Sequence, residues 1–425
     1  MKRKITLLLA FFPLLLNAQS YVNRVIILNE GHYDYVNMVQ TVPVTVGAYN
    51  PVTHQYAAFD TILNARFASH VLVDGSSIYV AADSFLIRYD ADTYQRLATA
   101  TVTGIRKLAV WNNQLLVSRG EYMVTFNSYF RAYDKSTLAF SYELTTASGP
   151  QFASENIVVK NNIGYVAINN GFDFGNEVGL IGRIDLQLQQ YMNEINLGTT
   201  GKNPENMILD GNTLYTVNNR DYTTASISNV DVVSQAVNTT NLNTSTGCGA
   251  SGYTPGYVMF QVMGDNRIAR FSVSTLSMHD TLLINRSIYG MATDPVNNLI
   301  YIGETDYLSS GNIFIYNLAG ALLDSFAVSV SPGTMDFDIR STAGIKSAEE
   351  LTTFSAFPNP FNGLITISSS QRGEKVFVIT DVAGRVIKRI VTDEYNVTID
   401  LAGCDAGVYI LQQEEHAGKM KIVKQ

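Results

Sequence analysis

The sequence predicts an all-β protein, a seven-bladed β-propeller followed by a small immunoglobulin-like β-sandwich. Three observations support this fold class. The chain contains 24 Tyr and 20 Phe residues, and aromatic residues favour strands. Short runs that alternate apolar and polar residues are separated by Gly, Asn, Asp and Pro throughout residues 19–339. One strand-and-turn unit recurs seven times, and the composition changes after residue 340.

Residues 1–18 have the features of a signal peptide. Three basic residues at positions 2 to 4 precede the apolar run Ile5 to Leu16, and small or neutral residues precede a predicted cut before Gln19. A run of this length is too short to cross a bilayer, which needs about 20 apolar residues. No cysteine lies near the cut, so we expect no lipoprotein anchor. No other apolar run is long enough for a transmembrane segment.

The charge of the exported chain limits its partners. Removing the three bases of the signal from 29 basic residues leaves 26 against 37 acidic residues, a net charge of −11. Binding to phosphate backbones needs a basic face, so we expect no nucleic acid partner. The two cysteines, Cys248 and Cys404, fall in different predicted domains, and we interpret them as two thiols rather than a disulfide.

The repeated unit is marked by the polar residue that ends one of its strands and opens a turn. Consecutive markers are separated by 40, 44, 51, 46, 41 and 45 residues. They are Asn50, Asp90, Asp134, Asp185, Asp231, Ser272 and Asn317. Such side chains accept hydrogen bonds from the backbone of the following turn. A period of this length with four short strands per unit is typical of a β-propeller, and seven units predict seven blades.

We expect one blade to be shared between the two ends of the propeller, which spans residues 19–340. The strand Gly333 to Ile339 lacks partners of its own, and the strand Arg24 to Glu30 lacks a preceding strand. Pairing the two would close the ring and remove the exposed edges that a sheet otherwise presents.

A second domain is predicted after a polar linker over residues 341–353. Residues 354–425 contain alternating strands with a turn at 382–384, which favours the small immunoglobulin-like sandwich. Several short motifs within it follow one another in a fixed order. They are Pro358, Asn359, Pro360 and Phe361, then Asp381, Gly384 and Arg385, then Gly407 and Tyr409, and finally Lys421 and Lys424.

On these motifs the last segment resembles the C-terminal sorting domain of the type IX secretion system. The resemblance implies that the type IX machinery is a partner in export. It also implies that the protein is secreted or displayed on the outer-membrane surface after passing the periplasm. The alternative is an adhesive sandwich domain that stays attached, because fold alone does not fix function.

The propeller resembles YncE-like and surface-layer-type propellers. The residues that carry this resemblance are the "NEG" at positions 29–31 and the units that pair a strand such as "IYV" with a strand ending in "YD". Some of these relatives capture corrinoids for an outer-membrane transporter. The resemblance therefore implies a surface binding protein with a corrinoid as one candidate ligand, and it leaves the ligand itself open.

The candidate binding residues lie in loops that follow one strand of each unit, where a propeller presents them around its central channel. Loops on a rigid scaffold are common positions for binding residues. The candidates are Tyr33, Tyr35, Arg119, Tyr122, Phe172, Arg220, Tyr222 and Tyr307. Rings would stack on a planar or sugar-like ligand, and the two cations would attract a carboxylate or phosphate. The alternative for the tyrosines is that they only pack between blades.

We assign no catalytic residue, no metal ligand and no cofactor. The five histidines form no H-x-H or H-E-x-x-H pattern, and no G-x-S-x-G motif occurs. The sequence therefore predicts a ligand-binding or scaffolding protein with a small-molecule, glycan or protein ligand. The alternative is a secreted enzyme of the lyase or lactonase type that uses acidic residues facing the channel.

Overall fold

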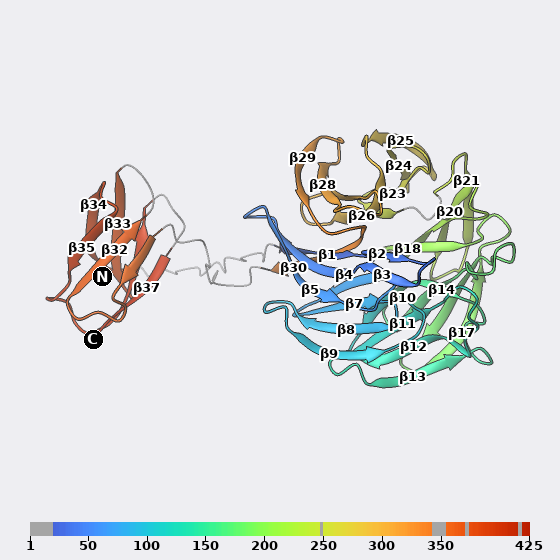
Figure 1. Cartoon of the computed structure of the whole chain (residues 1–425), viewed down its shortest axis with the longest axis horizontal. Helices are drawn as coiled ribbons and strands as arrows, with labels where there is room; N and C mark the ends of the chain where they lie inside the picture. Colours follow the sequence, from blue (N-terminus) through green and yellow to red (C-terminus); the bar gives the residue numbers. More distant parts are fainter. Residues whose placement is uncertain (1–19, 247–249, 342–353, 370–373, 415–418) are drawn as a thin grey trace, which may run out of the picture. The chain divides into compact units, whose positions relative to one another are not determined.

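The computed structural model describes residues 20–246, 250–341, 354–369, 374–414 and 419–425. The predicted signal peptide, the linker residues 342–353 and Cys248 lie outside these residues. The chain divides into two compact units, Gln19–Ser341 and a second that includes Thr342–Gln425 (Figure 1). All regular structure in the described residues is β-strand. None of them forms a helix long and apolar enough to cross a membrane.

The described part of the larger unit contains seven four-stranded antiparallel sheets. The first joins the two ends of the unit, as expected, because the late strand β30 pairs with β1. The first four sheets are β30 (Pro332–Ser341), β1 (Ser20–Asn29), β4 (Val44–Asn50), β5 (Gln55–Ile62); β6 (His70–Asp74), β7 (Ser77–Ala82), β8 (Phe85–Asp90), β9 (Arg96–Thr101); β10 (Ile105–Trp111), β11 (Gln114–Arg119), β12 (Ser128–Asp134), β13 (Phe140–Thr145); and β14 (Ser154–Lys160), β15 (Ile163–Ile168), β16 (Leu180–Asp185), β17 (Gln190–Asn196).

The other three sheets follow the same order along the chain. They are β18 (Pro204–Asp210), β19 (Thr213–Asn218), β20 (Ala225–Asp231), β21 (Val237–Leu242); β22 (Ser251–Thr254), β23 (Tyr257–Gln261), β24 (Arg267–Ser272), β25 (Ser277–Leu283); and β26 (Ile288–Asp294), β27 (Leu299–Glu304), β28 (Asn312–Asn317), β29 (Leu322–Ala327). The first strand of each sheet contacts the first strand of the next, and β26 contacts β30, so these seven strands form a closed, propeller-like ring (Figure 1).

Each predicted marker residue ends the third strand of its sheet, and the expected turn chemistry is present. Asp90 Oδ1 accepts hydrogen bonds from the amides of Asp92 and Thr93 at 3.0 and 2.8 Å. Asp231 Oδ1 does the same for Val233 and Ser234 at 3.0 and 2.7 Å. The turn residue therefore satisfies two amides that would otherwise lack a partner, which explains why a short polar side chain recurs there.

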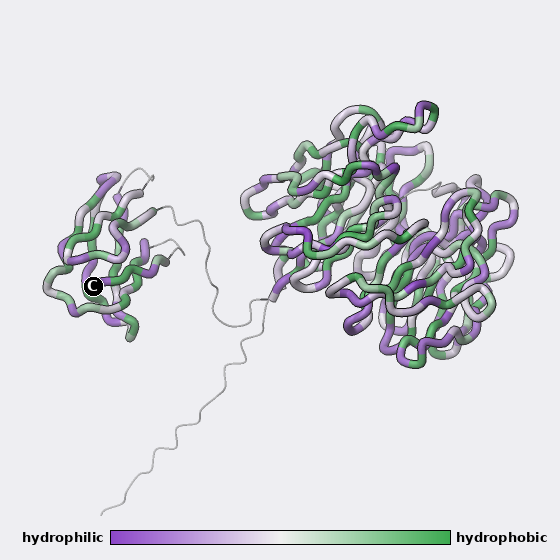
Figure 2. Tube along the Cα trace, turned by 60° about the horizontal axis from the view of Figure 1, so that its bottom comes forward, coloured by the Kyte–Doolittle hydropathy of each residue, from purple (hydrophilic) through white to green (hydrophobic). Residues whose placement is uncertain are grey.

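The core of this unit lies between neighbouring sheets. Tyr79, Tyr165 and Tyr301 are buried in hydrophobic clusters that join one sheet to the next. Burying such a side chain contributes about 1.5–3 kcal/mol. Figure 2 shows hydrophobic and hydrophilic stretches alternating along the chain of this unit. The outermost strands are more exposed, as the pattern of β25 shows.

One element of the larger unit differs from the sequence interpretation. The candidates Tyr33 and Tyr35 were expected in a loop, but this part of the chain forms a two-stranded hairpin of β2 (His32–Asp34) and β3 (Val39–Val42). Asp34 Oδ1 accepts hydrogen bonds from the amides of Val36 and Asn37, which closes the turn. Tyr33 therefore lies in β2 and Tyr35 in the turn that follows it.

The smaller unit contains two sheets that share one hydrophobic core. The sheets are β31 (Phe354–Phe357), β32 (Leu364–Ser369), β35 (Asn396–Asp400); and β34 (Val386–Thr392), β33 (Lys375–Asp381), β36 (Gly407–Gln413), β37 (Lys419–Lys424). Ile365 and Ile399 of the first sheet pack in the same cluster as Phe377, Leu411 and Ile422 of the second. Alternating burial along β36 shows the two-residue period that such packing requires.

Candidate ligand-binding site

The innermost strands of five sheets share a β-bulge near their start. The register with the second strand shifts after the first residue of β10, β14, β18 and β26, and at the matching place in β30. A bulge leaves a residue unpaired and re-aims its side chain. The second residue of each strand is therefore turned toward the centre of the ring. These residues are Arg106, Glu155, Glu205, Tyr289 and Gly333.

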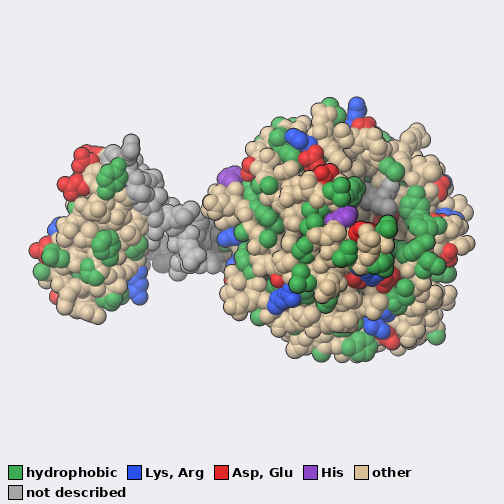
Figure 3. Space-filling view, in the orientation of Figure 1, with side chains coloured by type: hydrophobic (Ala, Val, Ile, Leu, Met, Phe, Trp, Pro, Cys, Tyr) green, Lys and Arg blue, Asp and Glu red, His purple; other side chains and the backbone are tan. Residues whose placement is uncertain are grey.

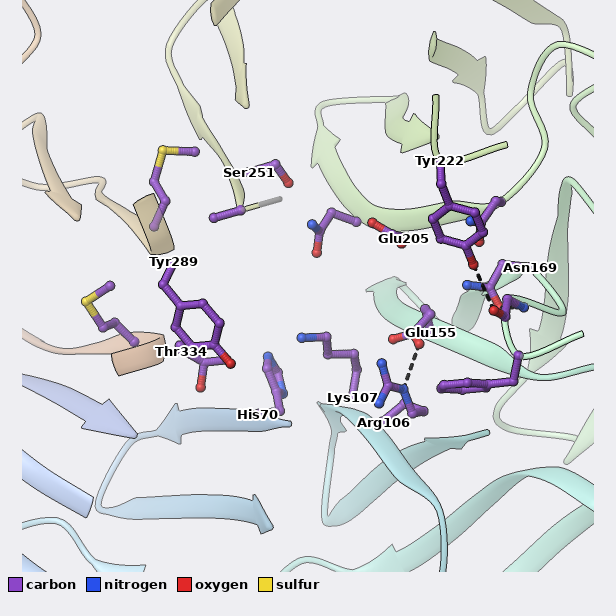
Figure 4. Close-up of a pocket in the computed structure, with 18 of the residues that line it drawn as sticks. His70, Arg106, Lys107, Glu155, Asn169, Glu205, Tyr222, Ser251, Tyr289 and Thr334 are labelled. Carbon is purple, nitrogen blue, oxygen red and sulfur yellow. Dashed lines mark hydrogen bonds and ion pairs between the residues drawn. The ribbon is translucent and has the colours of Figure 1, made fainter. Parts of the chain in front are cut away.

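A cavity of about 430 Å³ lies where these bulges converge, and all seven innermost strands contribute to its lining. This volume falls within the range of small-molecule sites, about 300–1,000 Å³. Figure 3 shows the face of the larger unit hollowed near its centre, with charged side chains inside the hollow. Figure 4 shows Lys107, Glu155, Glu205 and Tyr289 pointing into the cavity from different strands.

Two cations enter the cavity from β10. The Arg106 guanidinium donates to Glu155 Oε1 at 2.6 Å and lies 4.9 Å from the centre of the Phe172 ring. Burial acts to lower the pKa of Arg106, but Glu155 and more distant carboxylates outweigh it, so the pKa is raised. Lys107 Nζ donates to the carbonyl oxygen of Ser69 at 3.0 Å. Burial lowers the pKa of Lys107.

Glu205 is the titratable acid of the cavity. Burial raises its pKa to about 7, and the nearby Glu155 adds to this rise. The side-chain amide of Asn219 donates to Glu205 Oε1 at 3.2 Å and partly opposes it. Glu205 therefore exchanges its proton near neutral pH, so a ligand's charge can change its protonation.

Two further groups of the cavity are held in neutral forms. The Tyr289 hydroxyl donates to Glu30 Oε2, and burial together with Glu30 raises the pKa of Tyr289. The backbone amide of Leu108 donates to His70 Nδ1 at 3.1 Å, which leaves the ring proton on Nε2. Burial lowers the pKa of His70 well below its usual value, so the ring stays neutral.

Several buried polar atoms around the cavity have no hydrogen-bond partner among the described residues. They are both amide atoms of Asn203, the Ser251 hydroxyl and the Thr334 hydroxyl. Asn203 is fully buried. Buried polar atoms are almost always paired with protein, solvent or ligand. A polar molecule in the cavity would supply these missing partners.

Aromatic side chains surround the opening. Phe172, Phe174 and Tyr222 line the cavity. The rings of Phe174 and Tyr222 lie 5.6 Å apart, and Tyr122 packs 6.0 Å from Phe174. The Tyr222 hydroxyl donates to the carbonyl of Gly171 at 2.8 Å, which fixes its ring at the edge. Tyr307 packs 5.4 Å from the lining residue Tyr289.

The aromatic residues among the sequence-predicted candidates therefore divide into three groups. Phe172 and Tyr222 line the cavity, while Tyr122 and Tyr307 each contact a ring that does. Tyr33 and Tyr35 pack on each other at 4.8 Å in the β2–β3 hairpin and do not line the cavity.

The two predicted arginines do not reach the cavity. Arg119 is buried, where it donates to the carbonyls of Thr103 and Ser128 at 2.9 and 2.7 Å. Its guanidinium also lies 4.0 Å from the Phe126 ring, so its contacts hold strands together. Arg220 contacts Asn241 Oδ1 at 3.4 Å on the exposed face. The cations that do line the cavity are Arg106 and Lys107, which the sequence interpretation missed.

A local signal for the missed residues exists. The innermost strands begin "IRKL", "SENI", "PENM" and "IYGM", so a polar or aromatic residue stands second, before the first apolar residue of the strand's core-facing pattern. The loop-based interpretation treated these stretches only as lead-in strands.

The predicted sorting-motif residues join the start of the smaller unit to its last strand. Asn359 donates to the carbonyl of Lys421 at 2.8 Å and accepts from the amide of Val423 at 2.9 Å. Phe361 is buried in the core, and its amide donates to the carbonyl of Val423. Lys424 Nζ donates to the carbonyl of Ala402 at 2.8 Å.

The remaining motif residues form a turn and a strand start. Asp381 accepts from the amides of Ala383 and Arg385 and pairs with the Arg385 side chain at 2.6 Å. Gly384 has a φ of 82°, a conformation that favours glycine. Gly407 begins β36, and the Tyr409 hydroxyl donates to the carbonyl of Asp405 at 2.7 Å.

No group of three or more His, Cys, Asp or Glu residues within the described part of the chain is placed to hold a metal ion.

Comparison with known proteins identifies the tail and the fold. Residues 355–425 match the family described as a secretion system C-terminal sorting domain. This tail indicates a secreted, cell-surface protein exported by the type IX secretion system. No curated protein matches the chain.

Solved structures with a similar fold are distant in sequence. A hypothetical selenium-binding protein from Sulfolobus tokodaii is 8% identical, with a TM-score of 0.59 over 76% of this chain and 94% of that one. The extracellular domain of BT4673 from B. thetaiotaomicron is 12% identical, with a TM-score of 0.50 over 94% of this chain and 57% of that one. At these identities the likeness concerns the fold alone, and these neighbours are of the propeller type.

Proposed function

We propose that this protein is a secreted or surface-displayed seven-bladed β-propeller that binds a small polar ligand in its central channel. In this proposal the seven four-stranded sheets are the blades, with residues 19–340 as the propeller. Residues 354–425 act as an immunoglobulin-like sorting domain that directs export and takes no part in ligand binding. Residues 1–18 are a signal peptide, and residues 341–353 link the two domains.

The observation that carries the proposal is the convergence of unpartnered polar groups and fixed charges in one cavity. Asn203, Ser251 and Thr334 present atoms without partners among the described residues, next to the charges of Arg106, Lys107, Glu155 and Glu205. Desolvating such groups is costly unless a molecule in the cavity pairs with them. A structure built only for stability would fill this space with apolar side chains.

Most of the cavity's titratable groups are held in fixed forms. Glu205, whose pKa is raised to about 7, is the group that a lyase could use as its base, whereas the Tyr289 hydroxyl already donates to Glu30 and its pKa is raised. A neutral, buried His70 accepts a backbone hydrogen bond on Nδ1 and is held as a donor through Nε2. We therefore retain the lyase or lactonase function only as the alternative.

The size of the cavity limits the ligand. A volume of about 430 Å³ accommodates a monosaccharide or a molecule of similar size. A corrinoid of the kind bound by some YncE-like proteins is larger than this and would have to rest on the aromatic rim. A glycan end group is the better fit, because its hydroxyls can both donate to and accept from Asn203 and the two hydroxyl residues.

The test is a titration of the mature chain with defined probes. We would use glucose, N-acetylglucosamine, glucosamine, glucuronate and cyanocobalamin in calorimetry or ligand-observed NMR. A blocked variant, Ser251→Trp, places an indole in the cavity, and Ser277→Trp on the exposed outer strand β25 is the matched control. At least one probe should bind the native chain and the control but not the blocked variant. The proposal fails if no probe binds, or if the block leaves binding unchanged.

A further inference from the structure

We propose that the ligand of the channel cavity is a small carboxylated polyol of the acidic-monosaccharide class. Its carboxylate pairs with Lys107, and its hydroxyls contact Asn203, Ser251 and Thr334. This inference rests on the proposed function, because it names the chemical class bound in the same cavity. It follows from the distribution of charge, of open hydrogen-bond positions and of rings around that cavity.

The two cations of the cavity differ in their partners. The Arg106 charge is taken up by Glu155, since their side chains form an ion pair at 2.6 Å. Lys107 Nζ donates one hydrogen bond, to the neutral carbonyl of Ser69, and within the described residues it forms no ion pair. An ammonium has three donors. Lys107 therefore brings open donors to the cavity, into which it points in Figure 4, and Glu155 and Glu205 offset its charge only through longer-range interactions.

A buried, unpaired ammonium is unfavourable, and an anion that enters the cavity relieves that cost. The shape of the site favours a carboxylate on a small molecule over a bare anion. The unpartnered atoms of Asn203 include one acceptor and two donors, and Ser251 and Thr334 each add a hydroxyl. The hydroxyls on neighbouring carbons of a sugar can each donate and accept a hydrogen bond. They can therefore pair with this mixture of protein donors and acceptors.

Aromatic side chains at the edge of the cavity would supply the remaining contacts with the ligand. Phe172, Phe174 and Tyr222 supply an apolar face at the edge of the same cavity, with Phe174 and Tyr222 5.6 Å apart. The apolar face of a sugar ring packs on aromatic side chains, which adds contact area without charge. A flat aliphatic carboxylate such as acetate would leave both these rings and the amide of Asn203 without contacts.

Proton uptake by Glu205 on ligand binding provides a second, independent test of the proposal. The groups that face it are Glu155 from β14, Arg106 and Lys107 from β10, and Asn219 from the loop after β19. Across the cavity lie the neutral His70 of β6 and Tyr289 of β26, the latter bonded to Glu30. An anionic ligand would add a further negative charge near Glu205 and raise its pKa above 7, so binding should take up a proton.

The sign of the pH effect follows from this linkage. Protonated Glu205 dominates below its pKa and repels the ligand's carboxylate least. Acidic sugars should therefore bind more tightly at pH 6 than at pH 8, by about tenfold for a full coupled proton. A neutral sugar carries no such charge, so its affinity should change little over the same range.

The experiment compares glucuronate and galacturonate with their neutral counterparts glucose and galactose, which differ at one carbon. Calorimetry of the full mature chain at pH 6 and pH 8 should show uronates binding at least about tenfold more tightly than neutral sugars, as expected for a desolvated charge pair. Glucosamine tests for a preference for cations, and inorganic phosphate tests for a plain anion site.

Three variants assign the residues. Lys107→Met should remove the preference for uronates over neutral sugars, and Lys107→Arg should retain it. Glu205→Gln should keep uronate binding and lose its pH dependence. Lys160→Met is the matched control, because Lys160 lies at the far end of β14, where it donates to Asn212 Oδ1 at 2.6 Å. Unfolding followed by Trp111 fluorescence verifies that each variant is folded.

The outcomes separate this inference from the proposed function. If neutral sugars or glucosamine bind as tightly as uronates, or phosphate does, the carboxylated-polyol class is overturned while the channel site stands. If uronates bind equally to the native chain and to Lys107→Met, the assignment of Lys107 is overturned. If no probe binds, both proposals fail.

Discussion

The substitution Asp336→Asn should change how the stability of the larger unit depends on pH. Asp336 lies within β30, the strand that closes the ring, where it pairs with Ile26 of β1. Its carboxylate accepts from the amide of Val73 in the neighbouring sheet at 2.7 Å and from the amide of Phe337 at 2.8 Å. Burial of the carboxylate raises its pKa from 3.8 to about 6 in spite of both bonds.

The direction of this pH effect follows from the pKa of Asp336, which is 3.8 in the unfolded chain and about 6 in the folded chain. Between about pH 4 and pH 6 the folded chain holds a proton that the unfolded chain has released, so the group's favourable contribution is complete below pH 4 and is lost as pH rises past 6. A pKa that is about two units higher in the folded chain corresponds to about 3 kcal/mol. The residue is not wholly shielded from solvent, so we expect about 1–3 kcal/mol after screening.

The assay is guanidinium unfolding of the parent and of Asp336→Asn at pH 4.5 and pH 8. Trp111 in β10 is the one tryptophan of the chain, so its fluorescence reports on the larger unit. Replacing a carboxylate oxygen with an amide nitrogen has its own cost in unfolding free energy. Because this cost does not depend on pH, it cancels when the two pH values are compared. The parent should lose about 1–3 kcal/mol relative to the variant between pH 4.5 and pH 8. An unchanged difference, or a relative gain for the parent, would refute the reasoning.

Three further predictions concern the turns, the tail and the linker. Asp231→Ala should lower the midpoint of thermal unfolding because two turn amides lose their acceptor, whereas Asp231→Asn should lower it less; equal effects would count against the capping role. Phe361→Ala should destabilise the smaller unit by about 3–5 kcal/mol, seen as faster hydrogen exchange in residues 354–425 with an unchanged Trp111 transition. Limited proteolysis should cut first within residues 341–353, and early cuts inside the larger unit would contradict this.

Much of the fold was predictable because its signals are local. The residues that end the third strands interact with amides only two and three positions later, so their spacing alone marks each unit. The pairing of the two ends of the larger unit was also predictable, since the strand at each end lacked a partner in its own segment. The β2–β3 hairpin was missed because its strands are short and its tyrosines were interpreted as loop residues.

The site was predicted only in part, because its positions depend on register. Phe172 and Tyr222 were found through their place in the loops, which the repeat fixes. The inward direction of Arg106 and Glu205 depends on bulges against the second strand, and a one-residue shift in register is not visible in a strand's own composition. The prediction for Arg119 was wrong for a similar reason. The carbonyls that hold its side chain belong to Thr103 and Ser128, which lie outside its own strand, so the local pattern around Arg119 does not reveal them.

The bulged position also explains why the fold does not reveal the ligand. The same backbone feature places one residue from each of five strands at the cavity, so the identity of those residues decides which ligand can enter. On β30 this residue is Gly333, and a Cβ there would lie 3.1 Å from the Tyr289 ring. The absence of a side chain at Gly333 gives Tyr289 the space in which it reaches Glu30. Similar structures at 8–12% identity share the fold alone, so ligand chemistry has to be argued from the site.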